Sequence, residues 1–185
     1  MTSATTYPHL TGEYTIDGTH SRIGFVARHA MVTKVRGSFN EFDGSFTVNG
    51  DDPAKSSATV TIQTKSIDTR NADRDGHLRT NDFLSTDEHP TITFTSTDVT
   101  QTGDDTFDVT GELTIKGITK SVTIPFEFGG SAKDPYGNDR VGFDGSTAVN
   151  RSDFGVTFNA PLETGGVLVS DKITLEFEIS AIKNA

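Results

Sequence analysis

The segment 107–115 alternates apolar and polar residues with a period of two. Its large apolar side chains stand at odd positions (Phe107, Val109, Leu113 and Ile115), and polar residues fill the even positions. Successive side chains of a β-strand point to opposite faces, so this pattern predicts a strand with one apolar face.

The same alternation recurs at 122–128 and at 173–179, where Val, Ile, Leu and Phe share one face. Strands of this kind must bury their apolar faces together, and an antiparallel meander does so most simply by closing into a barrel. The interior of such a barrel is either filled by its own side chains or left hollow for an apolar ligand. The function of the chain depends on which of these two holds.

Composition narrows the class of protein. A chain of 185 residues fits a single all-β domain. Its aromatic residues are 13 Phe and 3 Tyr with no Trp, so nearly all of the aromatic surface lacks a polar group and suits a dry interior. The absence of Cys excludes disulfides and thiolate chemistry. A formal net charge of -10 argues against nucleic acid as a partner, and against adsorption to anionic lipid by charge alone.

The N-terminal residues carry no targeting pattern. Residues 1–12 contain neither a basic start nor an apolar run, so we expect a flexible segment there, followed by a single domain over 13–183. No stretch approaches the roughly 18 apolar residues of a membrane-spanning helix. These features favour a cytoplasmic protein without stable membrane insertion.

The alternating segments predict about eight antiparallel strands in an up-and-down barrel. We expect a first hairpin from 12–17 and 20–29, turning at Asp17-Gly18, and another over 106–128, turning at Lys116-Gly117. Further expected elements are a bulge or turn between Phe39 and Gly44, a loop over 49–53, a loop over 129–138, a strand near 140–149, a loop over 150–166 around a strand near 156–158, and a last strand over 171–182.

One segment breaks the alternation. Residues 71–79 are mostly polar and contain no β-branched side chain. They predict one short helix near residues 71–80, which begins after a Thr or Asn cap.

Residues 18–40 contain no acidic side chain, which is a strong asymmetry in a chain this acidic. The basic residues there are His20, Arg22, Arg28, His29, Lys34 and Arg36. One interpretation is a basic rim at one barrel end that holds a phosphate or pyrophosphate, since guanidinium groups match such oxygens. The alternative is a solvated outer face, because Arg22 and Arg28 have the opposite parity to Ile23 and Phe25.

Few residues suggest catalysis or metal binding. The histidines show no spacing that places two imidazoles on one face of a helix or strand: His9, His20, His29, His77 and His89. The acids around the expected helix fit a solvated lid with local caps. No nucleophile elbow, phosphate loop or dinucleotide fingerprint is present. We therefore expect no catalytic residue, no metal and no cofactor.

A series of ordered motifs resembles the YceI-like family over residues 13–182. The motifs are YTIDGTHSRIGF (14–25), Arg28-His29, GSF (37–39), SIDTR (66–70), RDGHLR (74–79), Asp82-Phe83, HPTITF (89–94), GELTIKGIT (111–119) and NRSDFG (150–155). Tyr14 stands where many relatives have Trp.

The resemblance implies a lipocalin-like antiparallel barrel with a helix over one end. It also implies a long interior pore that binds polyisoprenoid lipids, of the isoprenoid quinone or prenyl pyrophosphate type, and a homodimer. Many relatives carry an export signal, which this sequence lacks at residues 1–12.

Under this interpretation one group of residues contacts the lipid tail and another its head group. The predicted tail residues are Ile23, Phe25, Ala27, Phe39, Phe42, Ile62, Phe83, Phe94, Leu113, Phe126, Phe143 and Phe177. The predicted head-group residues are Arg28, His29, Arg74 and His77.

Our leading hypothesis is a protein that carries or sequesters a long isoprenoid lipid without covalent chemistry. Two alternatives remain. The surroundings of His29, Arg74, Asp75 and His77 could form a catalytic pocket for a similar hydrophobic substrate. The barrel could also be filled, and the protein a dimeric interaction module.

Overall fold

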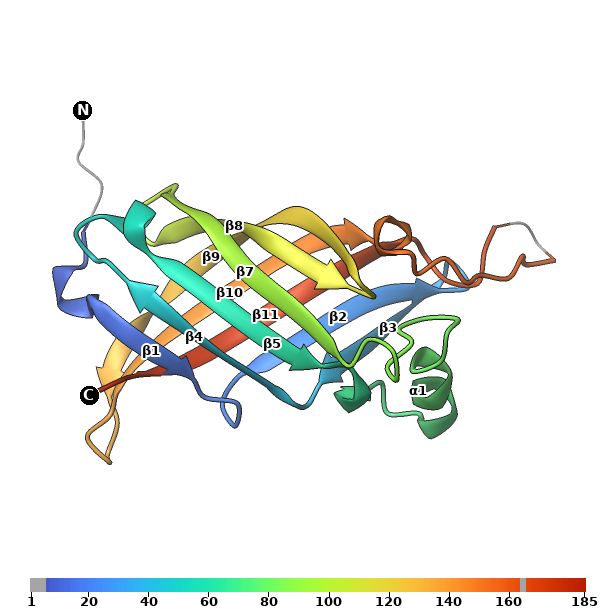
Figure 1. The fold of residues 1–185 in the computed structure, drawn as a ribbon, viewed down its shortest axis with the longest axis horizontal. Coiled ribbons are helices and arrows are strands. Elements are labelled where there is room, and N and C mark those ends of the chain that lie inside the picture. The colour runs from blue at the N-terminus through green and yellow to red at the C-terminus, as the bar shows by residue number, and fades with distance from the viewer. Residues whose placement is uncertain (1–5, 164–165) are drawn as a thin grey trace.

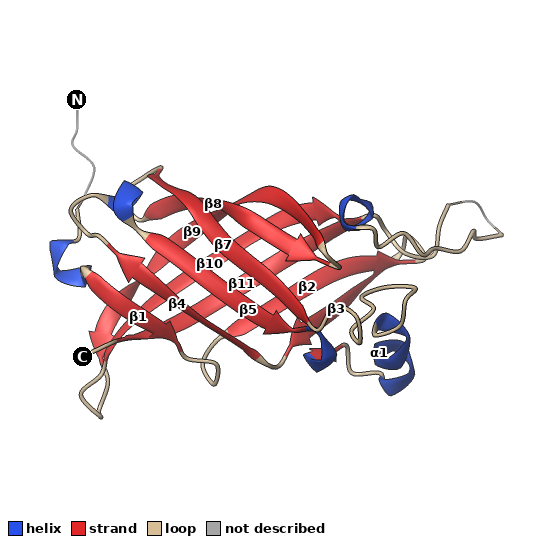
Figure 2. Cartoon of the chain, in the orientation of Figure 1, coloured by secondary structure: helices blue, strands red, loops and turns tan. Residues whose placement is uncertain are grey.

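The computed structural model describes residues 6–163 and 166–185, which form one antiparallel β-structure with a short α-helix (Figures 1 and 2). The strands are β1 (Gly12–Ile16), β2 (Arg22–His29), β3 (Thr33–Phe39), β4 (Phe42–Val48), β5 (Ser57–Gln63), β6 (Ile67–Asp68), β7 (Thr91–Gln101), β8 (Thr106–Ile115), β9 (Ile118–Lys133), β10 (Asp139–Asn150) and β11 (Lys172–Lys183). The helices are α1 (Ala72–Leu78) and the 3-10 turns η1 (Pro8–Leu10), η2 (Pro53–Lys55), η3 (Thr64–Ser66) and η4 (Arg151–Phe154).

The sheet closes on itself. Its strands follow the order β1-β4-β5-β7-β8-β9-β10-β11, and an additional pairing of β1 with β11 completes the ring. This ring is the predicted eight-stranded antiparallel barrel. The remaining strands β2, β3 and β6 extend its wall beyond β1, because residues 181–183 of β11 pair with β1 and residues 174–178 of β11 pair with β2.

The expected hairpin between 12–17 and 20–29 is wrong. Both segments pair in succession along β11, with Ile16 opposite Ala181 and Arg22 opposite Glu178. The Asp17 carboxylate accepts hydrogen bonds from the Thr19 amide and hydroxyl groups, so a turn does form there. The Asp17 amide donates to the Ser180 carbonyl, which keeps the chain on β11 and makes the turn a kink in one wall strand.

Three other boundaries differ from or refine the sequence prediction. The parity change after Phe39 is a break between β3 and β4, whereas Asp43-Gly44 lies inside β4. The expected loop at 129–138 is shorter, since β9 continues to Lys133 by pairing with β10. Residues 156–158 do not form a strand, because the Phe158 ring packs against the His77 and Phe83 rings instead.

The predicted helix and the second predicted hairpin are confirmed. The Asn71 side chain accepts a hydrogen bond from the Arg74 amide at 3.0 Å, which caps α1. The turn between β8 and β9 has positive φ at Lys116 (52°) and Gly117 (77°), the conformation that two-residue hairpin turns favour. α1 lies beside one end of the barrel (Figure 1). Among the described residues, no helix is long and apolar enough to cross a membrane.

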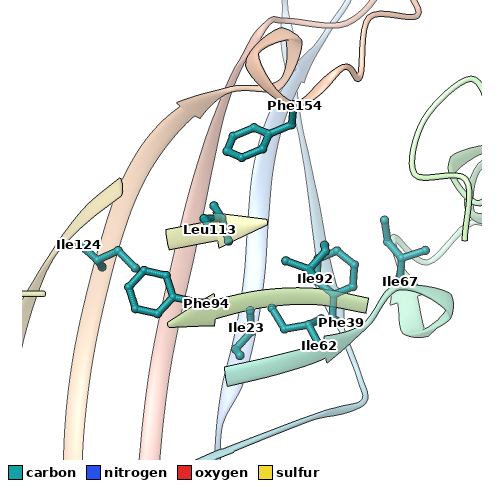
Figure 3. Packing of buried hydrophobic residues seen from close by; sticks show 9 residues of the cluster. All are labelled: Ile23, Phe39, Ile62, Ile67, Ile92, Phe94, Leu113, Ile124 and Phe154. Atoms are coloured by element: carbon teal, nitrogen blue, oxygen red, sulfur yellow. The ribbon is translucent and has the colours of Figure 1, made fainter. Parts of the chain in front are cut away.

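The buried apolar side chains of the barrel form two groups. The larger group converges from several wall strands and from η4, as Figure 3 shows; it consists of Ile23, Phe39, Ile62, Ile67, Ile92, Phe94, Leu113, Ile124 and Phe154. The smaller group, Leu10, Tyr14, Val141 and Ala181, lies where β1 meets β11. The Tyr14 hydroxyl donates to the Leu10 carbonyl at 2.8 Å, so this buried phenol has a partner and fixes η1 to the barrel.

Candidate functional site

An apolar cavity with a volume of about 200 Å³ lies inside the barrel. Among the described residues no charged side chain lines it, and its wall combines aliphatic side chains with eight phenylalanines: Phe39, Phe46, Phe94, Phe107, Phe126, Phe128, Phe143 and Phe177. An apolar cavity of about 150 Å³ is enough to hold a benzene ring. The interior therefore has room for an apolar ligand, and the barrel is hollow.

The cavity runs along the barrel axis. Phe107 and Ile115, at opposite ends of β8, both line it, and the eight steps between them, at about 3.3 Å each, span roughly 26 Å along the strand. Phe126 and Phe177 point into the closed barrel and yet are only half-buried, because the space in front of them is empty. A narrow apolar tube of this kind suits a linear hydrocarbon chain.

The cavity reaches the surface at the end formed by η1 and the β4–β5 loop. Thr47 and Ser57 are the exposed members of its lining, and the neutral polar residues Asn49 and Ser56 lie beside them. The Asn49 side-chain oxygen accepts hydrogen bonds from two amides of the same loop, and the Ser56 hydroxyl accepts one from the Asn49 amide. We call this polar edge, Thr47, Asn49, Ser56 and Ser57, the mouth.

Tyr7 covers part of the mouth. Its amide donates to the Gly50 carbonyl at 2.9 Å, and its hydroxyl donates to the Asp104 carbonyl at 2.6 Å. Its ring meets the Phe128 ring edge-on at a centroid distance of 5.2 Å. A side chain at Gly50 would overlap the Tyr7 backbone, so glycine is needed for this close approach. Part of the predicted flexible segment 1–12 lies outside the described residues, and its residues 7–12 pack against the barrel.

The charges nearest the mouth are acidic. Asp51 and Asp52 follow Gly50 in the loop, and Asp104 and Asp105 form the β7–β8 turn that holds Tyr7. A single cation, Lys55, lies in the same loop, with its Nζ 3.9 Å from an Asp52 carboxylate oxygen. The described residues of these two loops therefore carry a net negative charge.

Buried side chains fill the opposite end of the barrel, next to α1. Ile67 of β6, Phe83 of the segment after α1 and Phe154 of η4 are all buried there. The buried Arg151 guanidinium donates to the carbonyl groups of Val156, Val169 and Ser170, which holds the long loop after η4 across this end. Burial lowers the pKa of Arg151 from its ordinary value.

Most of the predicted tail residues line the cavity, namely Ile23, Phe39, Ile62, Phe94, Leu113, Phe126, Phe143 and Phe177. The other four lie outside the lining. Phe25 packs against Gly37 and the Phe39 ring, Ala27 and Phe42 are half-buried on β2 and β4, and Phe83 packs against the His77 ring. The role of all twelve residues in tail binding stays a prediction.

None of the four predicted head-group residues lines the cavity. Arg74 donates to the Thr69 hydroxyl and carbonyl oxygens at 2.7 and 2.8 Å, and His77 Nε2 lies 2.8 Å from an Asp82 carboxylate oxygen. Arg28 and His29 are exposed at the far end of β2. Strand parity alone does not reveal which barrel end is open, so the sequence did not point to the mouth residues, although the loop over 49–53 was expected.

A closed antiparallel barrel with an apolar cavity open at one end is the architecture of lipocalin-like ligand-binding proteins. A YceI-like domain model matches residues 14–181, and the chain belongs to this family. The UPF0312 protein of Azotobacter vinelandii is 43% identical over 149 residues, which cover 80% of this chain and 78% of that protein. A UPF0312 protein of Pseudomonas aeruginosa is 44% identical with the same coverage.

Solved structures share the fold. BcnA of Burkholderia cenocepacia superimposes with a TM-score of 0.79 at 25% identity, covering 89% of this chain and 98% of that one. The YceI protein of Campylobacter jejuni gives 0.72 at 29% identity, with coverages of 85% and 90%. A polyisoprenoid binding domain from Saccharophagus degradans gives 0.71 at 15% identity, with coverages of 92% and 98%, and this likeness concerns the fold alone.

Proposed function

We propose that this protein binds a long-chain isoprenoid lipid in its cavity, and carries or sequesters that lipid without covalent chemistry. The hollow, Phe-lined interior is the observation that carries the proposal, because a filled barrel could not hold a tail. The polyisoprenoid binding domain of Saccharophagus degradans, which has the same fold, gives further support.

The mouth favours an uncharged head group of the isoprenoid quinone type over a pyrophosphate. The Asn49 side-chain amide and the Ser56 hydroxyl can each still donate a hydrogen bond to a quinone carbonyl. A pyrophosphate at the same place would lie close to the acids of the 49–53 loop and the β7–β8 turn, and Lys55 is the one lysine within the described residues of those two loops. Repulsion between these carboxylates and the phosphate oxygens disfavours binding of a pyrophosphate.

The energetics fit exchange with a membrane. Burying one five-carbon isoprene unit gains roughly 2 to 4 kcal/mol relative to water, at about 0.8 kcal/mol per methylene-sized group. Relative to a bilayer the gain nearly vanishes, because acyl chains are as apolar as the barrel wall. The protein therefore selects its cargo by cavity shape and head group, and can both take up and release it.

Two measurements test the proposal. Organic extraction of the purified protein, followed by mass spectrometry, should recover an isoprenoid lipid. Because the chain has no Trp, Phe126→Trp places a single fluorophore in the cavity wall, and an isoprenoid quinone should quench it saturably. The matched control is Thr123→Trp, on the outer face of the same strand, where we expect no saturable quenching. An empty extract together with equal responses of the two variants would contradict the proposal.

The enzyme alternative has less support. The Asp75 carboxylate accepts hydrogen bonds from the Thr69 amide and hydroxyl, and Arg74 binds the same residue, so both side chains stabilise the start of α1. The His77 ring packs against the Phe83 and Phe158 rings, away from the cavity lining. The contacts of Arg74, Asp75 and His77 therefore stabilise α1 and the segment that follows it.

A further inference from the structure

The tip of the β2–β3 hairpin exposes apolar side chains. It lies at the α1 end of the molecule, beside the loop that follows η4 (Figure 1). Met31 and Val32 at the tip are 62% and 75% exposed, and Val167 of the neighbouring loop is 40% exposed. The Ala30 amide donates to the Leu168 carbonyl at 2.7 Å, so hairpin and loop are held together and present their apolar groups side by side.

Three exposed cations follow the outer face of the same hairpin. Arg28 stands directly opposite Lys34 in the β2–β3 register, and Arg36 is the next residue of β3 on that face. Like charges directly opposite on paired strands destabilise a sheet. Within the described part of the chain none of the three forms an ion pair, whereas Arg22, nearer the barrel, pairs with Glu176 at 3.2 Å. We call these three cations together with Met31, Val32 and Val167 the basic tip.

We propose that the basic tip docks on the surface of an anionic lipid bilayer. Cations near such a surface attract its head groups, and exposed apolar side chains next to them can enter the interface. Nucleic acid would satisfy the cations but not the apolar side chains. A symmetric second copy would bring the three cations of each chain against those of the other.

The rest of the molecule orients the docked state. With a formal net charge of -10, most of the surface is repelled by anionic lipid, so the basic tip faces the bilayer. The mouth, at the other barrel end among acids, then faces away from it. Docking is therefore separable from cargo binding, and this inference goes beyond the proposed function without depending on it.

Vesicle sedimentation tests the inference. The wild-type protein should bind vesicles of phosphatidylcholine with 30% phosphatidylglycerol (about a third anionic lipid), and bind less as salt screens the charges. Lys34→Gln with Arg36→Gln should weaken binding about 25-fold, since each charge near an anionic surface contributes about fivefold. Met31→Ser with Val32→Ser should also weaken it. The matched control, Lys55→Gln with Lys133→Gln, removes two exposed charges near the mouth and should leave binding unchanged.

Several outcomes would overturn the inference: no binding of the wild-type protein to anionic vesicles, equal loss in the control, or a tip-dependent dimer or RNA complex in place of vesicle binding. Quenching of Phe126→Trp fluorescence by a quinone measures cargo binding independently of vesicle binding. It should persist in the Lys34→Gln, Arg36→Gln background, so failure of docking and failure of cargo binding are distinguishable.

Discussion

Arg140 connects two turns that are far apart in the sequence. Its Nη1 donates to Asp17 at 2.9 Å and its Nε donates to Asp134 at 2.7 Å, so it ties the kink after β1 to the β9–β10 hairpin. The hydrogen bonds from Arg140 hold the pKa of both carboxyl groups well below the usual range, with further help from Thr19 at Asp17 and from Asn138 at Asp134.

This network predicts a dependence of stability on pH. Because both carboxyl groups have lower pKa values folded than unfolded, their contribution is present above about pH 4 and is lost as the pH falls below it. Arg140→Met should remove the strongest cause of the shifts. We expect the free energy of unfolding, measured with urea between pH 7 and pH 2.5 (about the lower limit for such work), to fall less steeply with acid in this variant. Lys133→Met, an exposed change nearby, should keep the wild-type slope; equal slopes for Arg140→Met and wild type would contradict the prediction.

At the scale of the elements, pairs of Phe and Gly shape the cavity wall. Gly145 of β10 stands opposite Phe126 of β9, and a Cβ at Gly145 would lie 2.6 Å from the Phe126 ring. The missing side chain lets the Phe126 ring lie flat on the neighbouring strand. Gly37 and Phe25 form the same arrangement on β3 and β2, outside the cavity lining.

Gly145→Ala should therefore push the Phe126 ring into the cavity. We expect a loss of about 1 to 3 kcal/mol in the free energy of unfolding from overpacking, and weaker quinone binding because the tube narrows. Gly142→Ala on the same strand is the control, since its Cβ would meet nothing closer than 3.9 Å. Urea unfolding and quinone titration check both variants. Unchanged binding in Gly145→Ala would show that this contact does not set the width of the cavity.

The elements differ in how far the sequence predicts them. Segments such as 107–115 were predictable because alternation reports directly which side chains face the core. The kink at Asp17-Gly18 was predicted as a hairpin turn, because a turn motif carries no information on whether the next strand pairs with the last one or with β11. Likewise, parity placed Phe126 and Phe177 on the interior face. It could not place the mouth at Asn49 and Ser56, which depends on how the barrel ends are capped.

At the scale of the whole molecule, the mouth and the basic tip lie at opposite ends of the barrel and differ in the charges next to them. The mouth is surrounded by Asp51, Asp52, Asp104 and Asp105, whereas the opposite end carries the basic tip. We expect the acids near the mouth to influence which head group binds there. We expect the basic tip to influence how the protein meets a charged surface. The family resemblance alone leaves quinone and pyrophosphate head groups as equals, and under the proposed function we expect the acids near the mouth to favour the quinone.

Thermal unfolding with two isoprenoids of identical tail and different head group tests that separation. A ligand at about 100 times its Kd stabilises the folded state by about 2.7 kcal/mol, which for a protein of this size corresponds to a Tm increase of roughly 5 to 10 °C. Geranylgeraniol, which is uncharged, should approach this increase, and geranylgeranyl diphosphate at the same concentration should give less because the acids at the mouth repel it. Raising the salt from about 0.1 M to 1 M shortens the Debye length from about 10 to 3 Å and should bring the two increases closer together. A larger increase with the diphosphate at low salt would mean that the head group lies elsewhere, at a cationic part of the surface.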